Sequence, residues 1–273
     1  MDSSAKDPVA KDLVRQISVI SAAVFMIIAA MVGVGVFGGT PVQELQDGAL
    51  AADATYLAPA SSAFSIWTAV YVGLFAYTLW QALPSQRANE RQRVLGWWVA
   101  LTMVLNGVWL VLAQFTTLVL TVIGIAVLLA ALSVTFRRAV VLSPSTGWVD
   151  RILIDGVTGL HLGWVTLATV ANLTAWLTVN LPASWEEHAA VWGMTVLAVV
   201  AVIGVAISWA SKRLAPSLAL AWGLSWLAVA RITDQPESLA IGYTAVVVAA
   251  VILIAGVAFT VRGLREPRSV QTA

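Results

Sequence analysis

The chain alternates between long apolar stretches and short polar connections. Eight apolar stretches are present, and each is close to the ~20 residues that a helix needs to cross ~30 Å of hydrocarbon. The pattern therefore predicts an all-α fold, a polytopic membrane bundle of eight transmembrane helices. The predicted spans are residues 17–38, 62–83, 95–115, 118–136, 153–179, 189–210, 214–230 and 239–261.

The distribution of basic residues orients these spans. With the N-terminus inside, 14 of the 15 Lys and Arg residues fall in cytoplasmic pieces, and only Arg231 falls in an external piece. Short cytoplasmic connections are enriched in Lys and Arg. We therefore expect a multi-pass protein of the cell membrane with cytoplasmic N- and C-termini. The cytoplasmic residues are Lys6, Lys11, Arg15, Arg87, Arg91, Arg93, Arg137, Arg138, Arg151, Lys212, Arg213, Arg262, Arg265 and Arg268.

The composition narrows the class of protein further. Of 273 residues, 60% are hydrophobic and only 11% are charged, with a mean hydropathy of +0.88. Spans and short connections thus account for nearly the whole chain, which leaves no room for a soluble catalytic domain. Membrane lipids are the expected partners, and nucleic acid is not. The absence of Cys rules out disulfides and thiolate catalysis.

One face of the fifth predicted span is aromatic and partly polar. At 100° per residue, five side chains fall within about a third of the helix circumference. An imidazole and a carboxamide that faced lipid would each cost several kcal/mol without a partner. This face is therefore predicted to contact protein or a ligand. It consists of His161, Trp164, Ala168, Asn172 and Trp176.

Three motifs on three spans together indicate a family. The second span opens with FSIWTAVY (residues 64–71), the third contains LNGVW (105–109), and the fifth contains WVTLATVAN (164–172) with Trp176 four residues later. This arrangement resembles the tryptophan-rich sensory protein family (TspO/MBR), the bacterial relatives of the mitochondrial translocator protein. That family has aromatic-x-x-W-T-x-x-Y, L-N-x-x-W and W-x-x-x-A-x-x-x-N-x-x-x-W on the corresponding helices.

The resemblance implies a pocket for a flat, largely apolar ligand, such as a tetrapyrrole (haem or protoporphyrin) or a sterol-like lipid. Indole and phenol rings would stack on the ligand, a small residue would leave room for it, and amides would bind its polar edge. No obligatory cofactor, metal site or catalytic residue is expected, and a homodimer is a candidate assembly. The implied ligand-binding residues are Trp67, Tyr71, Asn106, Trp109, His161, Trp164, Ala168 and Asn172.

The resemblance also divides the chain. Residues 1–180 correspond to a five-helix TspO/MBR-like membrane domain, whereas residues 181–273 add three transmembrane helices and a cytoplasmic tail. The external segment 39–61 is long and carries no basic residue. It is predicted either to cap the bundle, with a short helix within ALAADATYLA, or to be a disordered connection.

Several of these residues also have a purely structural interpretation. Asn residues between membrane helices commonly hydrogen-bond neighbouring helices, which applies to Asn106 and Asn172. His161 could be a hydrogen-bond donor in the core, a pH-sensitive ligand contact, or a single axial ligand of haem iron. Trp222 and Trp226 lie one turn apart on the seventh span, where they could extend a cavity or simply pack.

Alternative functions are a small-molecule transporter, whose three extra helices complete a permeation path, and a porphyrin-modifying enzyme. No Lys lies inside a predicted span, which argues against a retinal protein. Asp155 is the only acidic residue near a span interior, and its spacing from Arg151 predicts an interfacial ion pair. A buried carboxylate relay is therefore not supported, and a sensory or receptor protein that binds its ligand is favoured over an enzyme.

Overall fold

The computed structural model describes residues 6–38, 40–142 and 147–266. Within them, eight helical segments are long and apolar enough to cross a membrane, which confirms the predicted all-helical bundle. The predicted C-terminal tail beyond residue 266 lies outside the described residues. The helices are α1 (Lys6–Gly33), α2 (Ile66–Ala82), α3 (Glu90–Phe115), α4 (Leu118–Val141), α5 (Trp148–Asp150), α6 (Val157–Asn180), α7 (Ala189–Ser211), α8 (Ala215–Thr233) and α9 (Leu239–Arg265).

The fifth span is continuous but not uniformly α-helical. A π-helical turn, Arg151–Gly156, joins α5 to α6. Such turns widen a helix locally and are frequent at functional sites. In this chain the turn carries Asp155, a buried carboxylate.

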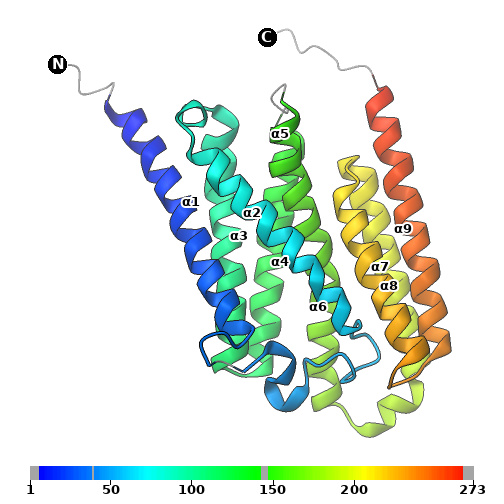
Figure 1. The fold of residues 1–273 in the computed structure, drawn as a ribbon. Helices are drawn as coiled ribbons and strands as arrows, with labels where there is room; N and C mark the ends of the chain where they lie inside the picture. The colour runs from blue at the N-terminus through cyan, green and yellow to red at the C-terminus, as the bar shows by residue number, and fades with distance from the viewer. Residues whose placement is uncertain (1–5, 39, 143–146, 267–273) are drawn as a thin grey trace.

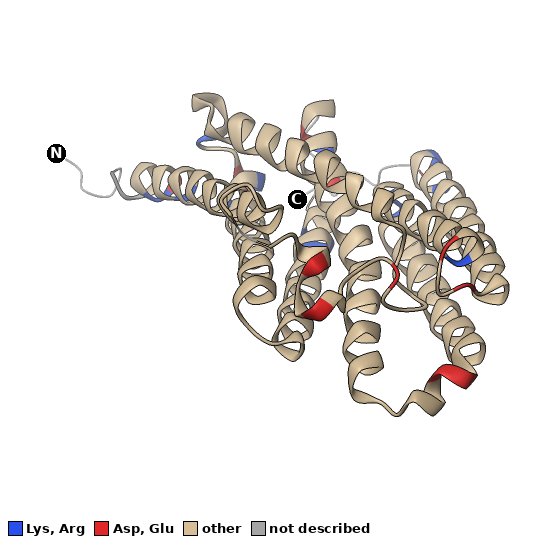
Figure 2. Cartoon of the chain, turned by 60° about the horizontal axis from the view of Figure 1, so that its bottom comes forward, with Lys and Arg blue, Asp and Glu red and all other residues tan. Residues whose placement is uncertain are grey.

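The helices form one bundle with both described ends of the chain on the same side (Figure 1). Helix α1 lies at one edge of the bundle and α9 at the other, while α2 crosses diagonally in front of its neighbours. Ribbon segments that carry Asp and Glu lie at the opposite end, which Figure 2 brings forward, and most of the ribbon between the two ends carries no charged residue. An even number of spans places the two described ends, at Lys6 and Glu266, on one side of a membrane.

Helix α8 lies close to α6, which joins the three C-terminal helices to the rest of the bundle. A Cβ atom on Gly163 would lie 2.3 Å from the carbonyl oxygen of Pro216, and one on Gly223 would lie 2.4 Å from the Leu167 side chain. Small residues allow this kind of close approach between membrane helices. Pro216 occupies the first turn of α8, where its missing N–H costs nothing.

We call residues 42–65 the lid. It connects α1 to α2 through three short 3₁₀ helices, Val42–Glu44, Gln46–Gly48 and Ser61–Ser65. Leu57 in its middle is fully buried, so this segment is an ordered cap of the bundle and not a disordered connection. The short helix expected within ALAADATYLA is absent, because residues 49–58 form successive turns.

Candidate ligand-binding site

The cavity of interest lies between the lid and helices α2, α3, α4 and α6. Its volume is about 50 Å³, whereas sites for small-molecule ligands usually measure about 300–1,000 Å³. The cavity is therefore smaller than an ordinary ligand site. The cavity is lined by Val42, Ala49, Leu50, Ala51, Ala52, Thr55, Ala58, Pro59, Phe64, Trp67, Asn106, Trp109, Ile125, Leu128, Trp164, Val165, Leu167, Ala168, Ala171, Asn172 and Ala175.

Aromatic rings from α2, α6 and the lid make up one wall. Trp164 receives Phe64 edge-on, with ring centroids 5.6 Å apart, and Trp67 at 6.2 Å and 81°. Trp67 in turn stacks on Tyr71 with centroids 5.1 Å apart. These contacts fix the orientation of the indoles in the cavity wall.

Four polar side chains at or directly behind the cavity wall are hydrogen-bonded within the protein. Nε1 of Trp109 donates to Oδ1 of Asn172 at 3.3 Å, and Asn172 donates to the carbonyl oxygen of Ala168 at 2.9 Å. The Tyr71 hydroxyl donates to Oδ1 of Asn106 at 3.2 Å. These bonds occupy Asn172 and the acceptor of Asn106 within the protein.

Two buried donors at the cavity have no hydrogen-bond partner among the described residues. They are Nδ2 of Asn106 and Nε1 of Trp164, whose side chains both line the cavity. A buried N–H without a partner costs about 1–3 kcal/mol. Each of these two residues therefore brings an unsatisfied hydrogen-bond donor to the cavity wall.

Six of the eight predicted ligand-binding residues line the cavity and two do not. Trp67, Asn106, Trp109, Trp164, Ala168 and Asn172 line it. Tyr71 lies behind them as the hydrogen-bond partner of Asn106. His161 also lies behind, fully buried and edge-on to Trp67 at 5.7 Å, so an axial bond from His161 to a haem iron in this cavity does not fit this structure.

Sequence reasoning missed most of the apolar lining. Phe64 opens the second-span motif, but its contact with Trp164 depends on the tilt of α2 across the bundle. The lid alanines carry no motif at all, because they line the cavity only through the way the lid folds back. The small residues Ala171 and Ala175 follow Ala168 on the same face of α6 and could have been found from that spacing.

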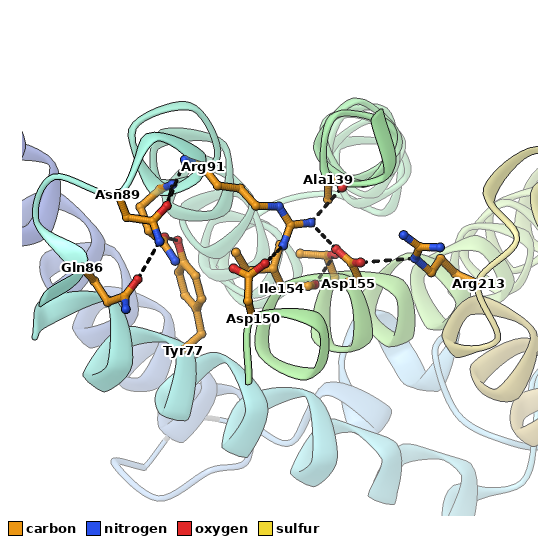
Figure 3. Close-up of polar contacts among 11 residues, drawn as sticks. Tyr77, Gln86, Asn89, Arg91, Ala139, Asp150, Ile154, Asp155 and Arg213 are labelled. Atoms are coloured by element: carbon orange, nitrogen blue, oxygen red, sulfur yellow. Dashed lines mark hydrogen bonds and ion pairs between the residues drawn. The ribbon is translucent and has the colours of Figure 1, made fainter. Parts of the chain in front are cut away.

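A buried ion network lies at the other end of the bundle (Figure 3). The Arg91 guanidinium contacts the carboxylates of Asp150 and Asp155 and donates to the carbonyl oxygen of Ala139 at 2.8 Å. Nε of Arg213, in the connection from α7 to α8, donates to Asp155 at 3.2 Å. The network thus connects α3 and the fifth span to the three C-terminal helices.

This network corrects one sequence prediction. Asp155 was expected to form an interfacial pair with Arg151, but its partners are Arg91 and Arg213. The π-helical turn changes the residue spacing here, and Arg151 is exposed whereas Asp155 is 3% exposed. Four-residue spacing brings side chains together only on a regular α-helix.

Comparison with known proteins agrees with this architecture. The model of the TSPO-like protein family matches residues 15–258. The match continues through α7, α8 and most of α9, well beyond the residues that carry the three motifs. No curated protein and no solved structure gives a significant match. From its family match and its eight-helix fold, the chain belongs to the TSPO-like protein family, a group of membrane proteins of the sensory or translocator type.

Proposed function

We propose that this protein binds a flat, largely apolar ligand with hydrogen-bond acceptors in the cavity beneath the lid. A tetrapyrrole such as protoporphyrin or haem has this chemistry, and a sterol-like lipid with one polar group is the second candidate. The observation that carries the proposal is the pair of unpaired buried donors, Nδ2 of Asn106 and Nε1 of Trp164, in an otherwise apolar aromatic cavity.

Binding requires the cavity to open, because about 50 Å³ is far below the volume of an ordinary ligand site. The lid contributes a large share of the lining and is the part that can move without separating the helices. We therefore propose that the ligand enters by displacing the lid. A protein that changes conformation in this way on binding could report the presence of its ligand.

The lining supports binding over catalysis. None of the described residues that line the cavity has a side chain that titrates near neutral pH, and acid–base catalysis needs such a group within reach of the substrate. For an enzyme, the absorption spectrum of the recovered porphyrin would change after incubation. We expect it to stay the same.

Transport is a less favoured alternative. The lining includes no residue of α7, α8 or α9, whereas the transporter hypothesis assigns those helices to the permeation path. Saturable uptake of porphyrin into proteoliposomes would favour transport. A binding protein of the sensory kind would give saturable binding without uptake.

The test is quenching of Trp fluorescence by protoporphyrin IX in the purified protein. Asn106→Leu keeps the side-chain size but removes the unpaired donor, so we expect affinity to fall about tenfold, which corresponds to about 1.4 kcal/mol. Asn180→Leu is the matched control, because Asn180 is an exposed Asn at the end of α6. Equal affinities for the two variants, or no saturable quenching of the unmodified protein, would contradict the proposal.

A further inference from the structure

The three C-terminal helices contribute nothing to the cavity lining, yet they hold the lid that closes it. Lid residues Ala49, Leu50, Ala51, Ala52 and Thr55 line the cavity. Their position depends on where the rest of the lid is attached. Most of those attachments are made to α8.

The central attachment is Arg231, at the end of α8. Its side chain is fully buried, and its guanidinium donates to the lid carbonyl oxygens of Thr55 at 3.0 Å and Ala52 at 3.2 Å. It also donates to Pro236 at 2.8 Å in the connection from α8 to α9. A charged donor makes each bond stronger than a neutral one, so one side chain fastens two lid turns to the C-terminal helices.

Two further bonds attach the lid where it approaches α2. Nε1 of Trp222 donates to the carbonyl oxygen of Ala63 at 3.0 Å, and the backbone N–H of Ala60 donates to the carbonyl oxygen of Trp226 at 3.2 Å. Leu57 packs among buried residues of α7, α8 and α9. Trp222 thus holds the lid through its side chain, whereas Trp226 contributes only a backbone carbonyl oxygen.

The other end of the lid is attached to the five-helix part. Nε2 of Gln46 donates to the carbonyl oxygens of Thr116 at 2.6 Å and Ala113 at 3.3 Å, at the end of α3. The cavity-lining turns lie between this attachment and those on α8. Releasing the α8 side would therefore free these turns while the lid stayed connected to α3.

We propose that α8 holds the lid closed over the cavity, and that Arg231 is the residue that positions it. Breaking the contacts of Arg231 with Ala52 and Thr55 would open the cavity from the lid end. The role of this step in ligand entry rests on the proposed function, but the closure itself does not. The three C-terminal helices would then hold the lid in place without lining the cavity themselves.

The test uses the absence of native cysteines. Ala175 lines the cavity and is 2% exposed, so Ala175→Cys is a reporter that a water-soluble maleimide reaches only when the lid opens. In detergent-solubilised protein we expect Arg231→Gln to raise the labelling rate about tenfold, because it weakens two charge-assisted bonds. Arg231→Lys keeps the charge but not the paired N–H donors of the guanidinium. Its labelling rate should lie between those of the Arg231 protein and the Arg231→Gln variant.

Two variants keep the test interpretable. Arg265→Gln removes an exposed arginine of α9 and should leave the labelling rate unchanged. Trp222→Phe keeps a large ring but removes the donor to Ala63, and should raise labelling severalfold even if Arg231→Gln folds poorly. Thermal unfolding of each variant, followed by circular dichroism, separates local opening from loss of the fold.

Faster labelling of the Arg231→Gln and Trp222→Phe variants at an unchanged melting temperature would support the proposal. Labelling rates equal to that of Arg265→Gln would overturn it. A separate measurement follows the association rate of protoporphyrin IX, which should rise severalfold in Arg231→Gln. If no variant binds porphyrin but the Arg231→Gln and Trp222→Phe variants are still labelled faster, the proposed ligand is wrong, whereas the proposal that α8 holds the lid closed is supported.

Discussion

The indole N–H of Trp109 on α3 and the amide oxygen of Asn172 on α6 form a hydrogen bond of 3.3 Å beside the cavity. Trp109→Phe removes the donor, and Asn172→Leu removes the acceptor. We expect each variant to lower the free energy of unfolding by about 1 kcal/mol. The double variant should lose about 0.6 kcal/mol less free energy of unfolding than the two single variants lose in sum. This difference is a typical coupling energy between membrane helices.

A double-mutant cycle on unfolding in mixed micelles measures this coupling. Asn180→Leu in place of Asn172→Leu gives the control cycle, since among the described residues Asn180 donates only to the carbonyl oxygen of Trp176, on its own helix. Strict additivity in the first cycle would mean that the observed bond does not stabilise the contact of α3 with α6.

His161 gives a prediction that differs from the one the sequence favours. From the sequence, His161 is a ligand contact or a hydrogen-bond donor, so His161→Phe should lower either affinity or stability. In the structure the ring lies outside the cavity lining, and neither nitrogen has a partner among the described residues. We therefore expect His161→Phe to keep the edge-on contact with Trp67 and to unfold at an equal or higher temperature.

Porphyrin affinity of the His161→Phe variant should stay within about twofold of that of the unmodified protein at both pH 5.5 and pH 7.5, because no ligand contact is lost. A tenfold loss of affinity, or loss of a pH dependence present in the unmodified protein, would restore the functional interpretation. That result would also mean that Trp67 moves aside when the ligand binds.

The sequence predicts the spans well because their signal is local. Twenty apolar residues in a row leave the backbone few alternatives in lipid. Seven predicted spans match helices of the structure to within five residues at each end, whereas α1 runs from Lys6 to Gly33 and not over the predicted residues 17–38. Six of the predicted residues line the cavity, and periodicity on a helix is enough to assign Trp164, Ala168 and Asn172 to one face; their role in ligand binding stays a prediction.

The remaining features depend on contacts between distant parts of the chain. Ala52 and Thr55 approach Arg231 across about 180 residues of sequence, and nothing in the local pattern distinguishes Arg231 from an exposed external arginine. The partners of Asp155 were missed because a π-helical turn rotates its side chain away from Arg151. Such contacts can be identified only when the packing of the whole bundle is known.

The ion network predicts an order of stabilities. Arg91→Met would leave Asp150 without its partner in a buried site, which we expect to cost about 3–5 kcal/mol. Arg213→Gln should cost less, because the Arg213 side chain is 32% exposed and water can replace it at Asp155. Arg151→Gln should be nearly neutral, within about 0.5 kcal/mol.

Thermal unfolding of the three purified variants checks this order. The comparison of Arg91→Met with Arg151→Gln is the informative one, because a regular helix would give the opposite result. Greater damage from Arg151→Gln than from Arg91→Met would show that Asp155 pairs along its own helix in the membrane.

The last prediction concerns the orientation of the bundle in the membrane. Because the chain has no cysteine, single cysteines can be introduced at exposed positions on the two ends: Glu44→Cys in the lid, and Ser85→Cys and Arg265→Cys at the end where α2 and α9 finish. The excess of Lys and Arg at the latter end predicts that it is cytoplasmic. A membrane-impermeant maleimide should therefore label the Glu44→Cys protein in intact cells, and should label the other two only after permeabilisation.

The reverse pattern would place the lid in the cytoplasm, so that a ligand would approach the cavity from inside the cell. Labelling of the two ends on the same side would contradict the eight-span bundle itself.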